Sequence, residues 1–248
     1  MRFDVVTLFP EMFTPFLTVG ITRRAFESGQ VDVRCSNPRD FAAGNYRRVD
    51  DRPFGGGPGM VMMAQPLELA LAHIRTQRTD AAPVVLFSPI GKRLDHAAVQ
   101  RWSNSSGAIL VCGRYEGIDQ RFIDTHVDEQ ISVGDFVLSG GEIPAIALLD
   151  AVARLQPGVL SDSDSHHMDS FNPALDGLLD CPHYTRPEQW NGFGVPDVLL
   201  SGHHVQIERW RRDQRLLITA EQRPDLLMAA RQAGLLGPED EAVLARGR

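Results

Sequence analysis

The sequence has no long apolar run, and this shortage excludes a membrane-spanning protein. A transmembrane helix needs about 20 consecutive apolar residues, and no segment of the 248-residue chain approaches that length. The N-terminal stretch MRFDVVTLFPEMF is interrupted by Asp4 and Glu11 and is not followed by a small-residue cleavage site, so it lacks the layout of a signal peptide. We therefore expect a soluble, cytoplasmic protein without a membrane partner.

Cysteine and lysine are also scarce. The three cysteines, Cys35, Cys112 and Cys181, are odd in number and match no zinc-binding spacing, so we expect reduced thiols and no metal site. Lys92 is the only lysine, which leaves arginine as almost the only basic residue. The arginine side chain suits phosphates and guanine edges, although genomic base composition would explain the same bias. The formal net charge of −7 argues against a uniformly basic surface but does not exclude a nucleic-acid partner.

The glycine motifs that bind nucleotide phosphates are missing as well. A dinucleotide fold needs G-x-G-x-x-G after its first strand, and the first expected strand, residues 2–9, is followed by no such motif. The P-loop pattern G-x-x-x-x-G-K-[ST] does not occur, and FGGGPGM at 54–60 lacks both its Lys-Ser/Thr pair and a preceding strand. These absences argue against a dehydrogenase and against a P-loop protein.

What the sequence does contain is an alternation of strands and helices. Apolar runs predict strands at 83–88, 107–112 and 128–133, and helical segments follow them at 94–104, 118–126 and 141–155. This order is typical of an α/β domain, in which a parallel sheet carries helices on both faces.

Glycine-containing loops follow the three strands. They are SPIGKRLD at 88–95, GRYEGID at 113–119 and GDFVLSGGE at 134–142. Because the carboxyl ends of parallel strands meet at one edge of a sheet, where ligands bind, we expect the loops to converge on one crevice. Their bare backbone N–H and C=O groups suit an adenine edge and a ribose better than a pyrophosphate.

The composition changes after the last of these helices. Residues 161–184 are rich in Asp, Ser, Pro, Gly and His and predict a flexible linker. Residues 185–248 predict three helices, the first of them capped by Ser201. We therefore expect an α/β domain over 1–160, a linker over 161–184 and a small all-helical domain over 185–248.

Four motifs, in this order, carry a resemblance to a known family. They are DDRPFGGGPGMVMM at 50–63, LVCGRYEGIDQR at 110–121, SVGDFVLSGGE at 132–142 and LLDCPHYTRP at 178–187. Together they resemble the bacterial tRNA (guanine-N(1))-methyltransferases, which methylate the guanosine at position 37, beside the anticodon. The resemblance covers about nine-tenths of the chain, from LFPEMF near the start to VLLSGHH near the end.

The resemblance implies a SPOUT-type α/β fold with a deep trefoil knot within about residues 85 to 140, a rare exception to the rule against knots. It also implies S-adenosylmethionine as the cofactor, bound in a bent conformation against the three glycine loops. The residues that it assigns to cofactor binding are Phe87, Ser88, Pro89, Gly113, Tyr115, Ser132, Val133, Gly134, Phe136, Leu138, Gly140 and Gly141. Taken without the family, these glycines are equally typical of ordinary turns.

The resemblance further implies the residues that carry the chemistry. Asp169 would be the general base for the proton on guanine N1, Arg154 would hold the guanine oxygen, and Glu116 would lie near the target base. By sequence alone, Asp169 is more typical of a solvated linker carboxylate and Arg154 of a helix C-terminus, and the family match reverses both preferences. His166 and His167 are alternative bases, given the pKa range of histidine.

The partners implied are tRNA and a second copy of the chain. The family forms a homodimer whose active site combines both subunits, and it is associated with magnesium for methyl transfer. The loop at 46–60 would line the shared site, and the candidate RNA contacts are Arg47, Arg48, Asp50, Arg52 and, on one face of the first C-terminal helix, Arg209, Arg212 and Arg215. A solvated basic loop is the alternative interpretation of residues 46–60.

Two other functions stay open at this point. One is a catalytically inactive RNA-binding protein of the same fold, which would be expected to lack the base or the cofactor glycines. The other is a knotted RNA ribose methyltransferase, which would not need a carboxylate base in a linker together with the DDRPFGGGPGM loop.

The position of Asp169 in the expected linker generates a prediction. Binding of tRNA would order residues 160–170 and complete the site, which would couple the chemistry to the correct substrate. Limited proteolysis should therefore cut this segment more slowly when tRNA is present. Equal cleavage rates with and without tRNA would contradict the coupling.

Overall fold

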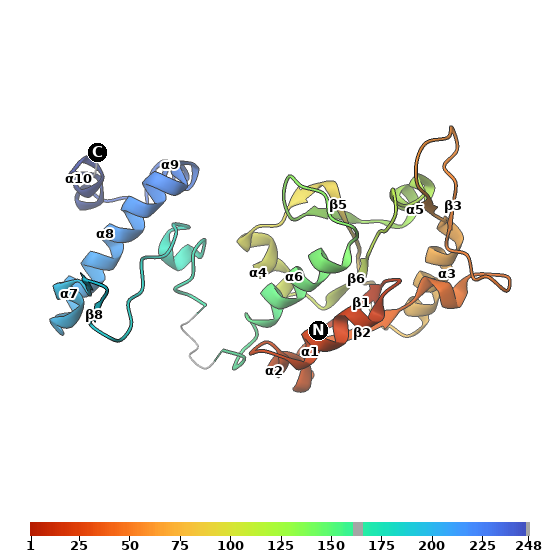
Figure 1. The fold of residues 1–248 in the computed structure, drawn as a ribbon, viewed down its shortest axis with the longest axis horizontal. Coiled ribbons are helices and arrows are strands. Elements are labelled where there is room, and N and C mark those ends of the chain that lie inside the picture. Colours follow the sequence, from red (N-terminus) through yellow and green to blue (C-terminus); the bar gives the residue numbers. More distant parts are fainter. Residues whose placement is uncertain (161–165, 247–248) are drawn as a thin grey trace. The chain divides into compact units, whose positions relative to one another are not determined.

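The computed structural model describes residues 1–160 and 166–246 and divides into two compact units, residues 1–161 and 162–248 (Figure 1). Residues 161–165, the first part of the expected linker, lie outside the described residues. The two units are described separately below.

The first unit is built on a five-stranded parallel sheet with the order β2-β1-β6-β5-β7. Its strands are β1 (Arg2–Val6), β2 (Asp32–Ser36), β5 (Val84–Arg93), β6 (Gly107–Val111) and β7 (Glu129–Ser132). The central strands β1 and β6 are buried along almost their whole length, as near-continuous apolar runs require. The predicted parallel α/β architecture is confirmed.

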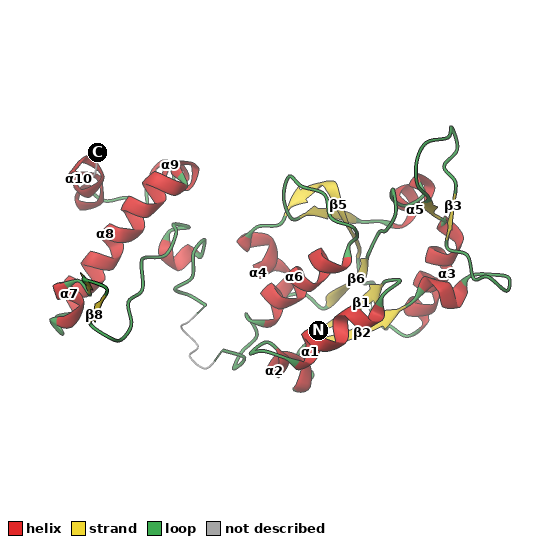
Figure 2. Cartoon of the chain, in the orientation of Figure 1, coloured by secondary structure: helices red, strands yellow, loops and turns green. Residues whose placement is uncertain are grey.

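Helices cover both faces of this sheet (Figure 2). On one face Phe3, Val5 and Leu110 pack with helices α1 (Phe13–Thr18), α2 (Arg23–Glu27), α4 (His96–Ser103) and α6 (Glu142–Ala153). On the other face Val6 and Ile109 pack with α3 (Ala64–Thr76) and α5 (Gln120–His126). Successive strand residues thus supply the two cores alternately, because side chains of a strand point to opposite faces.

Short elements connect these layers. Residues 10–12 and 38–41 form the 3-10 helices η1 (Pro10–Met12) and η2 (Pro38–Phe41). The region of the predicted 46–60 loop contains a small antiparallel pair, β3 (Asp50–Asp51) with β4 (Val61–Met62). The glycine-rich segment between these two strands is therefore the tip of a hairpin anchored on the first unit.

Strand β5 is longer than the predicted strand at 83–88, and its extension shapes the carboxyl edge of the sheet. The chain leaves the ladder after Phe87, and Lys92 and Arg93 then pair again with β7. A Cβ atom at Gly91 would lie 2.5 Å from the backbone carbon of Gln130, so only glycine allows the two strands to approach this closely. Residues 88–91 are thereby held as a bulge above the end of the sheet.

The second unit is mainly helical. Its elements are η3 (Pro173–Leu175), β8 (Gln189–Trp190), β9 (Phe193–Gly194), α7 (Asp197–Leu200), α8 (His204–Gln222), α9 (Pro224–Gln232) and α10 (Pro238–Arg246). Leu178, Leu216 and Leu244 are among the residues of its small core. The predicted cap is wrong, because Ser201 ends α7 and the residue before α8 is His203. None of the described helices in either unit is long and apolar enough to cross a membrane.

Part of the expected linker packs as an integral piece of the second unit. Leu175, Leu178 and Cys181 are buried, and the backbone N–H of Leu179 donates to Thr219 Oγ1 of α8 at 3.0 Å. The Asp, Pro and Gly residues around these side chains suggested a linker, but the spaced leucines place residues 173–181 in a core.

Helix α3 offers a matched test of the core. Leu71 is 1% exposed and packs against the sheet, whereas Leu69 on the same helix is 44% exposed. Leu71→Ala should lower the free energy of unfolding by about 2–5 kcal/mol, because it leaves a cavity. Leu69→Ala should cost less than about 1 kcal/mol. Urea denaturation of both variants checks this, and equal losses would contradict the described packing of α3.

Candidate cofactor and catalytic site

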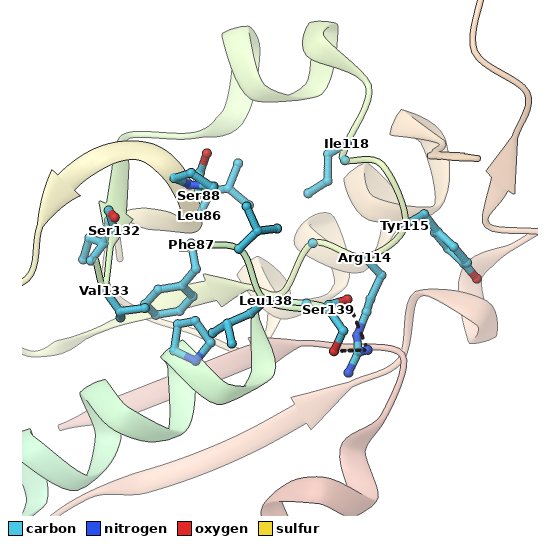
Figure 3. A pocket seen from close by; sticks show the side chains of 18 of the residues that line it. Leu86, Phe87, Ser88, Arg114, Tyr115, Ile118, Ser132, Val133, Leu138 and Ser139 are labelled. Atoms are coloured by element: carbon cyan, nitrogen blue, oxygen red, sulfur yellow. Dashed lines mark hydrogen bonds between the residues drawn. The ribbon is translucent and has the colours of Figure 1, made fainter. Parts of the chain in front are cut away.

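A cavity of about 270 Å³ lies at the carboxyl ends of β5, β6 and β7 (Figure 3). The three glycine loops converge on it, as predicted from the strand order. All of the residues that the resemblance assigned to the cofactor line it, namely Phe87, Ser88, Pro89, Gly113, Tyr115, Ser132, Val133, Gly134, Phe136, Leu138, Gly140 and Gly141. Segments far apart in the sequence are therefore brought to one place by the sheet topology.

Close backbone approaches hold two of these loops together. Gly141 N–H donates to the Gly113 carbonyl at 3.0 Å, and Arg114 forms an isolated β-bridge with Gly140. A Cβ atom at Gly141 would lie 2.7 Å from Cys112 Cα, so a side chain at this position would push the loops apart. Glycine is required here by the closeness of two chain segments, rather than by a turn.

A buried ion pair lies directly beneath these loops. Glu142, the first residue of α6, is fully buried, and its carboxylate accepts hydrogen bonds from Arg114 Nε at 2.8 Å and from Thr7 Oγ1 at 2.8 Å. Arg114 also donates to the Ser139 carbonyl at 3.3 Å, and its guanidinium carbon lies 4.4 Å from the centre of the Phe9 ring. The pair thus joins the end of β1, the loop after β6 and the loop after β7.

Sequence reasoning missed the roles of Arg114 and Glu142. A signal was present, since Glu142 opens a strongly apolar helix in which a carboxylate is out of place unless it has a partner. The sequence could not name that partner, because Arg114 lies 28 positions away. Only the folded loops show that the two charges meet.

The walls of the cavity are mainly apolar. Leu86, Ile131 and Pro144 line it together with glycine backbone, and the Ser132 hydroxyl is engaged with the backbone of Gly134, donating to its carbonyl at 3.1 Å. The one arginine of the lining is Arg114, whose charge is matched by Glu142. This lining fits a purine ring, a ribose and an apolar chain, and its described residues offer no free cation for a pyrophosphate.

The RYEG and GGGPGM motifs pack against each other beside the cavity. Glu116 N–H donates to the Met60 carbonyl at 2.9 Å, and the Glu116 side chain lies so close to Gly59 that a Cβ atom there would collide with it. Tyr115 adopts a left-handed backbone conformation with φ 60°, and its hydroxyl accepts from Arg39 at 3.3 Å. Glu116 is exposed and lines the cavity, whereas the Tyr115 ring points away from its interior (Figure 3).

The other two predicted catalytic residues lie outside this lining. Arg154 is half-buried at the C-terminal end of α6 in the first unit. Asp169 belongs to the second unit and is also half-buried. The rings of His166 and His167 stack at 4.0 Å, and the His166 carbonyl accepts from Asn172. The catalytic roles of these residues stay predictions.

The candidate RNA contacts of the first unit are exposed at the 46–60 loop. Arg47 pairs with Asp40 at 3.3 Å and Arg48 with Asp51 at 3.0 Å, with both arginine side chains more than half exposed. Arg52 is exposed as well, and Asp50 lies half-buried in β3. Weak surface pairs of this kind leave arginines able to exchange a carboxylate for a phosphate.

The three arginines of α8 are each engaged by carboxylates of the same unit, and their contact with RNA stays a prediction. Arg215 is 6% exposed and contacts Asp180 at 3.4 Å. Arg212 contacts Asp240 at 2.9 Å and Asp176, and Arg209 contacts Asp240 at 3.1 Å and Asp213. Helical spacing correctly placed the three on one face, but that face ties α8 to α10 and to residues 176–180.

The thiols are unsuited to act as nucleophiles. Burial raises the pKa of Cys35 to about 11 and holds the pKa of Cys112 well above its ordinary value. Burial also raises the pKa of Cys181. Because the thiolate is the reactive form, the raised pKa values keep these cysteines in the unreactive thiol form.

Comparison with known proteins gives a consistent result. The family model described as tRNA (Guanine-1)-methyltransferase TrmD matches residues 1–229. A protein of Albidiferax ferrireducens named tRNA (guanine-N(1)-)-methyltransferase is 75% identical over 245 residues, covering 99% of each chain. Proteins of the same name from Paracidovorax citrulli and a Polaromonas species are 72% and 70% identical, each covering 99% of this chain and 98% and 96% of their own.

The Arg114–Glu142 pair generates a prediction for the site. Glu142→Gln should leave the guanidinium without its counter-charge and lower the free energy of unfolding by roughly 2–4 kcal/mol, since breaking a buried pair is costly and Arg114 is still partly solvated. It should also weaken binding of S-adenosylmethionine, because the cavity loops lose their anchor. Thermal unfolding and titration calorimetry measure the two effects.

The matched control is Glu129→Gln. Glu129 pairs with Arg101 at the surface, where an ion pair contributes about 0–1 kcal/mol. Equal effects of the two substitutions would show that the buried pair does not support the loops.

Proposed function

Because this chain belongs to the tRNA (guanine-1)-methyltransferase family, we propose that it transfers a methyl group from S-adenosylmethionine to N1 of the guanosine at tRNA position 37. The observation that carries the proposal is the cavity at the ends of β5, β6 and β7, which is lined by the residues of the family motifs. Since tRNA is the substrate, we place the reaction in the cytoplasm.

The cavity residues bind and orient the cofactor in this proposal. S-adenosylmethionine supplies a methyl group already activated on a positively charged sulfur, so the protein needs no nucleophile of its own. Backbone groups of the three glycine loops would contact the adenine edge and the ribose, and the apolar walls would exclude water from the methyl group. The Arg114–Glu142 pair keeps the loops in the geometry that this binding requires.

The protein's chemical task is to move one proton and to stabilise one charge. When bound, S-adenosylmethionine would supply its methyl group to guanine N1, and the Asp169 carboxylate would accept the proton that leaves N1. The Arg154 guanidinium stabilises the negative charge that develops on the guanine oxygen. Glu116, exposed at the mouth of the cavity, positions the target base.

We further propose the trefoil knot within residues 85–140. Close crossings of the segments involved support it. Gly91 lies against the backbone at Gln130 and Ile131, Leu94 N–H donates to the Ser132 carbonyl at 2.8 Å, and Gly141 packs on Cys112. A chain can pass through a loop only if the two segments fit closely together. The close backbone approaches at these glycines would allow such a fit.

We propose in addition a homodimer whose active site is shared between subunits. Exposed apolar side chains beside the cavity support it, since Phe136 is 56% and Val137 82% exposed, and both line the opening. Ile143, the second residue of α6, is also exposed. Apolar groups gathered at one opening mark a surface that another chain covers, and the 46–60 loop of the second subunit would then contact the bound tRNA.

We include magnesium in the proposal because the family resemblance implies it for methyl transfer. Carboxylates suit this ion, and Glu116 and Asp169 are the carboxylates that would share it with the substrate. In the described part of the chain, clustered ligand atoms occur at Asp180, Cys181 and His183, a thiol and imidazole set that magnesium does not favour.

The experiment compares methyl transfer to tRNA transcripts that carry guanosine or adenosine at position 37. The wild-type protein should methylate only the guanosine transcript. Asp169→Ala should bind S-adenosylmethionine normally but transfer methyl at least about 100-fold more slowly, the usual contribution of a general base. Asp124→Ala, which removes an exposed carboxylate on α5, is the control and should keep full activity.

Two results would contradict the proposal. A wild-type protein that binds tRNA but methylates neither transcript would be an inactive RNA-binding protein, and methylation of both would point to a ribose hydroxyl. Full activity of Asp169→Ala would leave the reaction in place and move the base to Glu116 or to His166 and His167.

A further inference from the structure

A small hairpin in the second unit presents two aromatic rings to solvent. Residues 189–194, here called the aromatic hairpin, contain β8 and β9, in which Trp190 and Phe193 are directly paired. Directly paired residues of an antiparallel ladder project from the same face. Trp190 is 66% and Phe193 75% exposed, so both rings lie on one open face.

The turn makes this presentation rigid. Asn191 and Gly192 both have positive φ, 51° and 84°, as in the two-residue type I′ turn that matches the twist of a hairpin. The Val195 N–H donates to the Glu188 carbonyl at 2.9 Å and closes the base of the hairpin. The turn and this hydrogen bond therefore preorganise the two rings, which lowers the entropic cost of binding to them.

Arg186, close to the hairpin, differs from most other arginines of this unit in its ion pairing. The arginines of α8, α9 and the turn between them are engaged by carboxylates of the same unit, namely Arg209, Arg211, Arg212, Arg215, Arg223 and Arg231. Arg186, four residues before Trp190, is exposed, and no carboxylate within residues 1–160 and 166–246 forms an ion pair with it. A cation able to take a new anionic partner thus precedes the two rings.

We propose that the aromatic hairpin is a stacking platform for unpaired bases of the RNA substrate, with Arg186 contacting the adjacent phosphate. The inference rests on the proposed function, which supplies RNA as the ligand. Aromatic rings interleaved with arginine are the usual means of holding unstacked bases, and every base has a face that can stack. The platform therefore contributes affinity for the tRNA without reading its sequence.

The size of the surface favours RNA over a protein partner. Two rings bury about 150–250 Å² each, whereas a stable protein interface needs about 800 Å² from each partner. One or two stacked bases need no more than these rings.

Leucine and phenylalanine substitutions test stacking separately from apolar contact. Trp190→Leu and Phe193→Leu keep an apolar side chain but remove the flat ring, and each should raise the Kd for an unmodified tRNA transcript about fivefold or more. Trp190→Phe keeps a ring and should stay near wild type. In methyl-transfer assays the leucine variants should raise the KM for tRNA and leave kcat at saturating tRNA largely unchanged.

Tryptophan fluorescence adds a direct readout. Trp102 is buried and Trp210 half-buried, so quenching by added tRNA should come mainly from Trp190 and should fall sharply in Trp190→Phe. Met228→Ala, which changes an apolar side chain 55% exposed on α9, is the matched control and should alter neither Kd nor quenching.

The possible outcomes distinguish failure of the stacking platform from failure of the proposed methyl transfer. An unchanged Kd in the Trp190→Leu/Phe193→Leu double variant would overturn the platform even if the wild-type protein methylates tRNA. A change in sedimentation coefficient of that variant without RNA would overturn it in favour of a contact between copies of the chain. Weakened binding in the leucine variants would uphold it, and an absence of methyl transfer by the wild-type protein would then count against the proposed function alone.

Discussion

The site depends on one buried ion pair, between Arg114 and Glu142. It is the point at which the end of β1, the loop after β6 and the first turn of α6 are fastened to one another. A fully buried carboxylate is tolerated only because a guanidinium and the Thr7 hydroxyl satisfy it. The sheet gives the loops their common edge, and this pair fixes where their backbone lies along that edge.

Two glycines also help to hold the loops of the site in place. Gly91 and Gly141 stand where two chain segments touch backbone to backbone, so any side chain would separate them. The walls that result are made of peptide groups and apolar side chains, with no free cation. A cavity of this kind suits an adenine edge and a ribose better than a pyrophosphate, which agrees with the family to which the chain belongs.

Much of the first unit could be predicted from the sequence, because its strands and helices follow clear apolar periods. The cavity residues followed from the family motifs, and the topology brought them together. Pairings between distant side chains could not be predicted, as Arg114 with Glu142 shows. The sequence also could not show what the arginine face of α8 contacts. Arg209, Arg212 and Arg215 share that face, and the structure shows that carboxylates of α10 and of residues 176–180 engage it. The burial of Leu178 was hidden in the same way by its turn-forming neighbours.

The strand order has a consequence for synthesis of the chain. Arg2 pairs with Gly107, so β1 gains its second neighbour in the sheet only when the chain has grown by about a hundred residues. At roughly 5 to 20 residues per second, this delay lasts about 5 to 20 seconds. During that time β1 is an exposed apolar segment, and among the described strands β2 is its one earlier partner. The nascent chain thus spends a defined interval as a two-stranded edge that is open to chaperones and to aggregation, and the interval closes when β6 emerges.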